Sequence, residues 1–268
     1  MYSGLKKYKT TVIILIVISA LFFGSLPAVH AQNLQTVSVV EAFKEDNVHL
    51  AIGGNTTHVT RTLTIENEAN ESIVPGYIVL MLQKQTPDMI GPLAIPFTSE
   101  VKPVSVQNVK AYFQNGLNIT DINVTENNNS TVIQYGAWMP IDPGATLTVI
   151  LEYDSPDIVD NGLLFSTVDY PFTSSSIPVD NAVVEADING GHVSYASEKP
   201  TMNGSTYVWE QPQLGMGSWS VAFEYSALPL PLLPISGSML LWGLIILICL
   251  VWVAWTYTRP RKGQNKPR

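Results

Sequence analysis

The 268-residue chain has one cysteine, Cys249, which lies in an apolar stretch near the C-terminus. No disulfide can therefore stabilise the rest of the chain, and a cysteine nucleophile is excluded there. A blue-copper site is excluded as well, because it needs a cysteine thiolate. The sequence also lacks the G-x-S-x-G pattern of a nucleophile elbow. We therefore predict that the protein is not an enzyme and uses no cofactor.

Histidine is scarce too. The histidines after residue 31 are His49, His58 and His192, with no H-x-H or H-x₃-H spacing. A zinc site needs three or four converging ligands, so we expect none. Asp154, Asp157 and Asp160 could offer oxygens to a calcium ion, but their spacing does not match a calcium-binding loop. Calcium at this point stays an open alternative.

Basic residues are few between Gln32 and Ile235. This segment holds six Lys and Arg against all 22 acidic residues of the chain, which gives a net charge of −16. Nucleic acid and anionic lipid headgroups both attract Lys and Arg, so neither is an expected partner of this segment. The simplest interpretation of the acidic charge is solubility near a negatively charged cell surface.

Charge is absent from Ser236 to Tyr257. A helix of this length crosses the hydrocarbon core of a bilayer. Aromatic residues lie near both ends of the stretch, as an interfacial belt requires: Trp242, Trp252, Trp255 and Tyr257. Five basic residues and no acid follow. We predict a transmembrane helix over 236–258, which contacts lipid, and a cytoplasmic tail over 259–268.

The first 31 residues predict a signal peptide. A positive region with Lys6, Lys7 and Lys9 precedes an apolar run from Thr11 to Phe23, and small residues follow. We expect cleavage after Ala31, because the apolar run is short for a spanning helix. An uncleaved signal anchor is the alternative. With cleavage, the protein is a single-pass type I cell-membrane protein, with residues 32–235 outside the cell.

Asparagine is followed unusually often by Ser or Thr at the second position. Random placement of 17 Asn and 42 Ser plus Thr residues predicts about 2.7 N-x-[S/T] patterns. The chain has seven, all in the predicted outer segment: Asn55, Asn70, Asn118, Asn123, Asn128, Asn129 and Asn203. We expect N-glycosylation at two of them or more. A polar turn is the alternative explanation, since Asn favours turns without any glycan.

Helical periodicity is almost absent between Asn33 and Tyr225, where short apolar or alternating runs are separated by Gly, Pro, Asn and Asp. This pattern is typical of antiparallel β-sandwiches, and we predict an all-β ectodomain whose first two strands are Val37–Phe43 and Val48–Ile52. We expect two sandwich-like units, over 32–155 and 156–227. A proline-rich stalk over 228–235 would join them to the transmembrane helix.

One apolar loop is a candidate contact surface. It contains Met89, Ile90, Leu93, Ile95 and Phe97, interrupted by Gly and Pro. An exposed apolar loop would bind a protein partner, whereas a covered one would belong to the core. Three functions follow as hypotheses. The protein is a non-catalytic surface protein for envelope structure, adhesion or protein interaction; an accessory subunit of a larger membrane complex; or an exported enzyme or solute-binding receptor.

Overall fold

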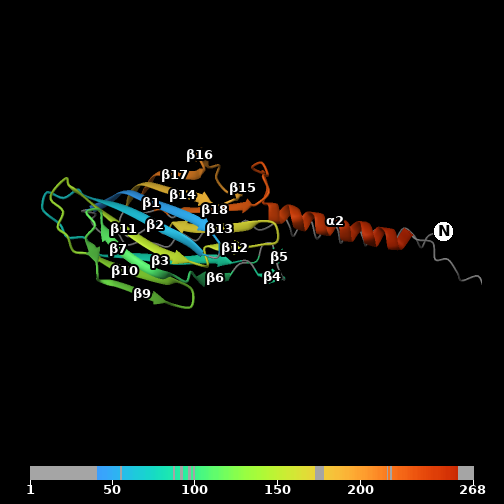
Figure 1. Ribbon diagram of the computed structural model, residues 1–268, viewed down its shortest axis with the longest axis horizontal. Coiled ribbons are helices and arrows are strands. Elements are labelled where there is room, and N and C mark those ends of the chain that lie inside the picture. The colour runs from blue at the N-terminus through green and yellow to red at the C-terminus, as the bar shows by residue number, and fades with distance from the viewer. Residues whose placement is uncertain are drawn as a thin grey trace, which may run out of the picture. The chain divides into compact units, whose positions relative to one another are not determined.

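A computed structural model describes residues 41–54, 56–86, 88–90, 93–95, 98, 100–172, 178–215, 217 and 219–258. The predicted signal peptide and basic tail lie outside these residues. The described part is mostly β-strand, with one apolar helix at its C-terminal end (Figure 1). The expectations of a β-rich chain and of a C-terminal apolar helix are therefore confirmed.

The largest sheet has eight strands in the described part of the chain, in the order β16-β17-β14-β1-β2-β11-β7-β8. Its strands are β1 (Glu41–Gly53), β2 (Thr56–Asn67), β7 (Gln107–Phe113), β8 (Asn118–Ile119), β11 (Thr146–Ser155), β14 (Val179–Ile188), β16 (Thr201–Asn203) and β17 (Thr206–Gly215).

Two four-stranded sheets and a hairpin complete the described strands. The first sheet has the order β6-β3-β10-β9 and the second β12-β13-β18-β15. Their strands are β3 (Gly76–Thr86), β6 (Glu100–Pro103), β9 (Ile122–Glu126), β10 (Thr131–Ala137), β12 (Val159–Asn161), β13 (Ser166–Phe172), β15 (His192–Ala196) and β18 (Trp219–Ser226). The hairpin is β4 (Met89–Ile90) with β5 (Leu93–Ala94).

Alternating side chains of all three larger sheets form one hydrophobic core. In β2 and β11, buried and partly exposed positions alternate along nearly the whole strand, as a strand with one covered face requires. Leu50 and Leu63 from the large sheet, Ile133 from β10 and Phe223 from β18 all lie in this core.

One strand pairing departs from the predicted antiparallel pattern. β1 is a single 13-residue strand, where the sequence predicts two strands over Val37–Phe43 and Val48–Ile52. It pairs in antiparallel fashion with β2 but in parallel with β14. Since β14 follows residue 156, the eight-stranded sheet contains strands from both sides of the predicted unit boundary.

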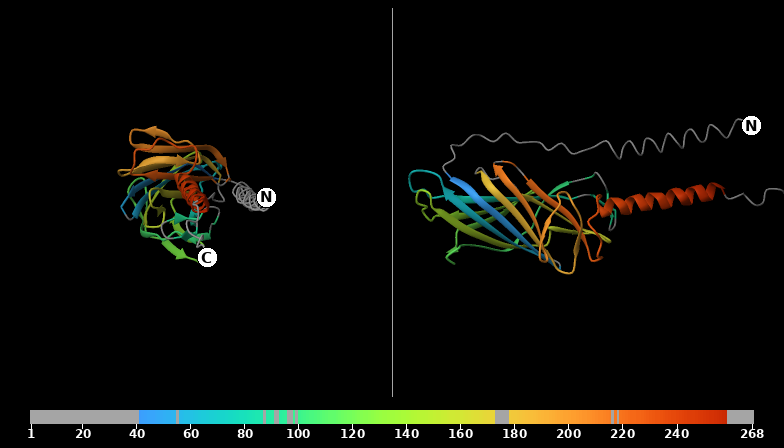
Figure 2. Two further views of the ribbon diagram at one scale, coloured as in Figure 1. Left: turned by 90° about the vertical axis from the view of Figure 1, so that its right-hand side faces the viewer. Right: turned by 90° about the horizontal axis from the view of Figure 1, so that it is seen from above.

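The helix α2 (Gly237–Thr258) is long and apolar enough to cross a membrane. Only 6% of its most apolar 18-residue window is buried in the protein, so it is not a core helix. Its first turn is attached to β18. The Glu224 carboxylate accepts hydrogen bonds from Ser236 Oγ and from the Gly237 backbone N–H, both at 2.6 Å. Figure 2 shows the helix leaving the β-sheet part near the end of β18.

Candidate functional site

The outer surface of the β6-β3-β10-β9 sheet carries an exposed apolar strip. On β3, Ile78, Leu80 and Leu82 point into the core, so the intervening residues point outward. Those outward residues are Tyr77, Val79 and Met81, which are 50%, 51% and 43% exposed. The neighbouring strand β10 adds Val132 opposite Met81. We call Tyr77, Val79, Met81, Val132 and the adjacent Trp138 the apolar face.

An aromatic pair closes one end of the apolar face. The rings of Tyr77 and Trp138 meet edge to face, with their centroids 4.9 Å apart. Asp121 fixes both rings: it accepts a hydrogen bond from Trp138 Nε1 at 3.2 Å, and its hydrogen bond to Tyr77 raises the pKa of that phenol. Trp138 lies directly over Gly136, where a Cβ would be 2.2 Å from the indole nitrogen. The pair is therefore held in place although Trp138 is 53% exposed.

A shallow depression adjoins the aromatic pair. It has a volume of about 400 Å³ and lies between Trp138 and the β7–β8 turn. Apolar side chains make up much of its lining: Phe113, Leu117, Ile119, Trp138, Met139 and Pro140. Rigid aromatic side chains next to an apolar depression are typical of the sites that dominate the energy of protein–protein binding.

The apolar face has a charged residue at its edge, Asp121, whose carboxylate is hydrogen-bonded to Trp138 and Tyr77. Beyond its five members, β3 presents Gln83 and Gln85, β10 presents Gln134, and β9 presents Asn123 and Thr125. Apart from Asp121, the outward positions named here are uncharged, although the segment from Gln32 to Ile235 has a net charge of −16. Depletion of charge distinguishes the centre of protein–protein interfaces from the remaining surface.

The sequence shows that β3 is apolar, but it does not show that one side of this strand is exposed. Residues Tyr77 to Leu82 form a continuous apolar run, which is typical of a strand covered on both sides. In the structure only one side of β3 is covered. The candidate loop predicted at Met89–Phe97 lies nearby in sequence: its strands form the β4–β5 hairpin, Ile95 is half-buried, and Phe97 lies outside the described residues. Its role as a contact surface stays a prediction.

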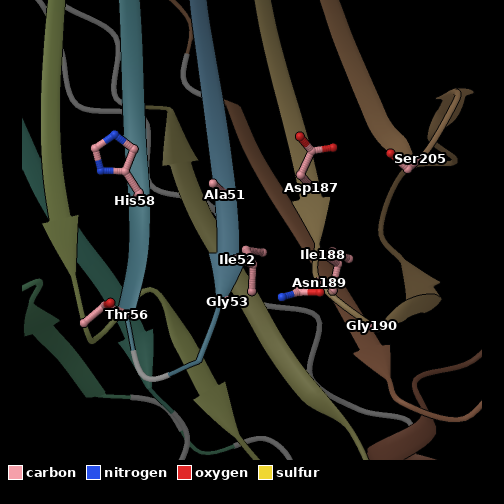
Figure 3. Close-up of a pocket in the computed structure, with 10 residues that line it drawn as sticks. All are labelled: Ala51, Ile52, Gly53, Thr56, His58, Asp187, Ile188, Asn189, Gly190 and Ser205. Carbon is pink, nitrogen blue, oxygen red and sulfur yellow. The ribbon is translucent and has the colours of Figure 1, made fainter.

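A second depression, of about 630 Å³, lies at the ends of β1, β2 and β14 (Figure 3). It is lined by polar groups that include His58, Asp187 and Ser205. Figure 3 shows His58 and Asp187 on strands separated by β1, and each binds another partner. His58 Nδ1 lies 2.7 Å from Asp154 Oδ1, and His49 Nε2 lies 3.0 Å from Asp187 Oδ2.

The hydrogen bonds around Asp187 do not follow the hydroxyl–imidazole–carboxylate order of a catalytic triad. Thr206 Oγ1 donates to Asp187 at 2.5 Å, so the hydroxyl bonds the carboxylate and not the imidazole of His49. Activation of a hydroxyl nucleophile requires a base at the hydroxyl itself. The bonds from Thr206 and His49 lower the pKa of Asp187, which keeps it ionised and unsuited to act as an acid.

The three aspartates considered for calcium do not converge. Asp154 binds Asn108 Nδ2 and His58, and these bonds lower the pKa of Asp154. Asp157 accepts a hydrogen bond from the Ser105 N–H at 3.0 Å, and Asp160 binds Lys84 Nζ at 2.7 Å. Within the described residues, no group of three or more His, Cys, Asp or Glu side chains could hold a metal ion.

The described asparagines of the N-x-[S/T] patterns are all exposed: Asn70, Asn118, Asn123, Asn128, Asn129 and Asn203. Asn55 lies outside the described residues. Asn118 follows β7 in the short strand β8, and Asn123 is on β9. Asn128 and Asn129 lie in the turn between β9 and β10, and Asn203 ends β16. These positions offer room for a glycan, which requires an exposed asparagine.

Comparison with known proteins gives one relative with a substantial sequence match. The uncharacterized protein MJ1395 of Methanocaldococcus jannaschii is 33% identical over 148 residues, which are 53% of this chain and 98% of that protein. No protein-family model matches the chain.

Solved structures resemble the chain only distantly. A Legionella pneumophila protein described as nutrient-binding is 12% identical with a TM-score of 0.41, over 70% of this chain and 67% of the other. An M1 zinc metallopeptidase of Deinococcus radiodurans is 12% identical with a TM-score of 0.34, and the match covers 70% of this chain and 42% of that enzyme. The chain therefore matches less than half the length of the peptidase.

Proposed function

We propose that this chain, which belongs to the same family as the uncharacterized protein MJ1395 of Methanocaldococcus jannaschii, is a non-catalytic, single-pass cell-surface protein that binds another protein. Its β-sandwich-like ectodomain faces outward, and its apolar face is the contact surface. Membrane attachment is through α2, which is apolar and almost entirely uncovered by protein. Its orientation follows from the basic residues after Tyr257 and the acidic segment before Ser236.

The observation that supports this function best is the half-exposed row of large apolar side chains on β3. Tyr77, Val79 and Met81 lie side by side on a regular strand, so their positions are fixed by the sheet. Full burial of one such side chain contributes about 1.5–3 kcal/mol. Because these three residues and Trp138 are already about half buried, the burial that remains contributes roughly half of that figure for each, which favours association without setting the affinity by itself.

The character of the face defines the partner. A partner that approached mainly through salt bridges would need several charged residues here, whereas the face offers Asp121, whose carboxylate is already hydrogen-bonded to Trp138 and Tyr77. The matching surface is therefore a protein surface with an apolar centre and an uncharged polar rim, which can pair with Gln83, Gln134 and Thr125. Such a face also reduces charge repulsion where an acidic ectodomain meets another acidic surface protein.

N-glycosylation belongs to the same proposal. It is supported by the excess of N-x-[S/T] patterns and by the exposure of every described asparagine in them. A secreted orientation would bring these asparagines to the glycosylation machinery, whereas a cytoplasmic one would not.

The alternative function is an accessory subunit of a larger membrane complex. The observation that favours it is the exposure of α2, whose sides are free to pack against other helices. In that case the partner would contact the helix, and the apolar face of the ectodomain would not be required.

Site-specific photo-crosslinking in the full-length protein, in its native membrane, separates these functions. A photoreactive amino acid at Val79 should give a discrete higher-mass adduct, whereas the same group at Glu210, an exposed residue of β17, should not. Met81→Glu should abolish the Val79 adduct without lowering the melting temperature, because Met81 is outside the core. An adduct that forms only from positions on α2 would instead favour the accessory subunit.

A further inference from the structure

The junction between the β-sheet part and α2 is held by hydrogen bonds to a buried carboxylate. Glu224 is only 5% exposed, although it is a carboxylate. Its oxygens accept hydrogen bonds from Ser236 Oγ and the Gly237 N–H, and Ser236 Oγ in turn lies 3.3 Å from the Met239 N–H. The first turn of the helix thus has its free N–H groups satisfied by a strand residue and by its own N-cap.

The proline-rich stalk is also attached. The Leu233 N–H donates to the Ser194 carbonyl at 2.6 Å, which fixes the stalk to β15 three residues before the helix cap. The stalk is therefore hydrogen-bonded to β15, and the helix that follows it is hydrogen-bonded to β18.

The turn between β12 and β13 lies against the start of the helix. The Gly162 N–H donates to the Phe165 carbonyl at 3.1 Å and closes this turn tightly. Phe165 covers Gly237: a Cβ at Gly237 would be 2.5 Å from two carbons of the phenyl ring. The tip of the turn is Leu163 and Leu164, which are 61% and 48% exposed.

The length of α2 defines the height of this turn above the membrane. Its 22 residues span about 33 Å, close to the hydrocarbon thickness of roughly 30 Å. Gly237 therefore lies at the boundary between hydrocarbon and headgroups. Phe165 contacts Gly237, and the Cα of Leu164 is about 3.8 Å from that of Phe165. The two leucines are consequently at interfacial depth, and a large part of each side chain is exposed there.

We propose that Leu163 and Leu164 form a second lipid contact, which we call the leucine seat. These two side chains insert into the outer leaflet and hold the ectodomain against the membrane. The inference rests on the membrane anchoring in the proposed function. The tip from Gly162 to Phe165 has no charge. The nearest acid in the sequence, Asp160, is paired with Lys84, and the Glu224 carboxylate at the start of α2 is buried and hydrogen-bonded to Ser236 and Gly237. The contact is therefore with acyl chains and not with headgroup charge.

The strand pairings show which end of the ectodomain lies farthest from the membrane when Leu163 and Leu164 contact lipid. β11 runs from Thr146 to Ser155 and leads into β12 at the membrane end. On β7, which pairs with β11, Phe113 lies opposite Val149, toward the start of β11. The β7–β8 turn with Leu117 follows Phe113 and is thus at the far end. Trp138 borders the same depression as Leu117, so the aromatic pair faces away from the membrane.

Fluorescence of the full-length protein in phosphatidylcholine vesicles tests the seat. An NBD label is placed on the native Cys249, or at residue 164 or 117 through Leu164→Cys or Leu117→Cys in a Cys249→Ala background. Leu117 is the matched control, because it is a 57% exposed leucine in another turn. Lipids brominated near the top of the acyl chain should quench the label at 164, and its emission should shift to shorter wavelength, while the label at 117 stays unquenched.

The label on the native Cys249 separates a failure of the leucine contact from a failure of the membrane-spanning helix. If lipid brominated deep in the chain quenches the label on Cys249 but no bromolipid quenches the label at 164, the helix spans and the leucine seat is refuted. If no label is quenched, the membrane anchoring of the proposed function fails as well. Equal quenching at 164 and 117 would mean non-specific adsorption of the ectodomain and would also overturn the seat.

Discussion

At the scale of single residues, the most unusual feature is an ion pair in the core. Arg61 of β2 donates through Nε to Asp46 Oδ1 at 2.8 Å and through a second nitrogen to Oδ2, and both side chains are almost fully buried. Burial disfavours the charge of Arg61, but Asp46 outweighs this effect and raises the pKa of Arg61. Three buried tyrosines, Tyr135, Tyr153 and Tyr170, complete the polar centre, and burial raises their pKa values.

This pair leads to a prediction about stability. Arg61→Leu or Asp46→Leu leaves one charge buried without its main partner, which should lower the free energy of unfolding by about 3–5 kcal/mol. The double variant removes both charges, and we expect it to recover most of that loss. Urea unfolding of the three variants measures this, and Val79→Ala at the surface is the control. Losses that simply add in the double variant would contradict a coupled pair.

The sequence does not predict the pairing of these two residues. Arg61 alternates with the apolar Val59 and Leu63, but Asp46 falls between the two strands that the sequence predicts, and acidic and basic residues are normally assigned to the solvent. Only the register of β1 against β2, in which Asp46 is opposite Leu63 and Val48 is opposite Arg61, brings the two charges to neighbouring places. Register depends on contacts across the sheet, which a single sequence does not give.

At the scale of the strands, the apolar face and a glycosylation pattern share one surface. Asn123 on β9 is paired with Gln134 on β10, which is paired with Val79 on β3. Strands are separated by about 4.8 Å, so a glycan on Asn123 would start roughly 10 Å from Val79. The glycan would cover part of the apolar face and leave the side toward Trp138 open to a partner.

Removal of that glycan should therefore expose the face. In protein produced by a glycosylating host, Asn123→Gln should increase binding of an apolar dye such as bis-ANS and remove one glycan from the mass. Asn203→Gln is the matched control: it removes a glycan from β16 in another sheet and should leave dye binding unchanged. Equal dye binding by the two variants would show that the Asn123 glycan does not shield Val79.

The elements differ in how well the sequence predicts them. The helix α2 follows from composition alone, because 22 residues from Ser236 to Tyr257 carry no charge. The strand β11 follows from its alternation, with Leu147, Val149 and Leu151 inward. The unbroken β1 and its parallel pairing with β14 do not, since Lys44, Glu45 and Asp46 interrupt the apolar pattern. The exposed side of β3 is not predicted either, because Tyr77 to Leu82 form a continuous apolar run.

At the scale of the whole molecule, charge and apolar surface are separated. Acidic residues are confined to the segment before Ile235, and the uncompensated bases follow Thr258. Apolar side chains are exposed on α2, on the turn at Leu163 and Leu164, and on the apolar face. The first two meet lipid in our proposal, and the apolar face, where several such side chains lie side by side, is the surface that another protein would cover.

This arrangement predicts the outcome of proteolysis on intact cells. Proteinase K added outside should digest the segment from Gln32 to Ile235 and leave a small fragment that carries residues 259–268, detected through a C-terminal epitope. The bilayer protects that tail, because its bases cannot follow the helix across the hydrocarbon core. Lysis before digestion should remove the fragment, which serves as the control. A full-length protein that resists protease until the cells are lysed would place the acidic segment inside and overturn both the surface function and the leucine seat.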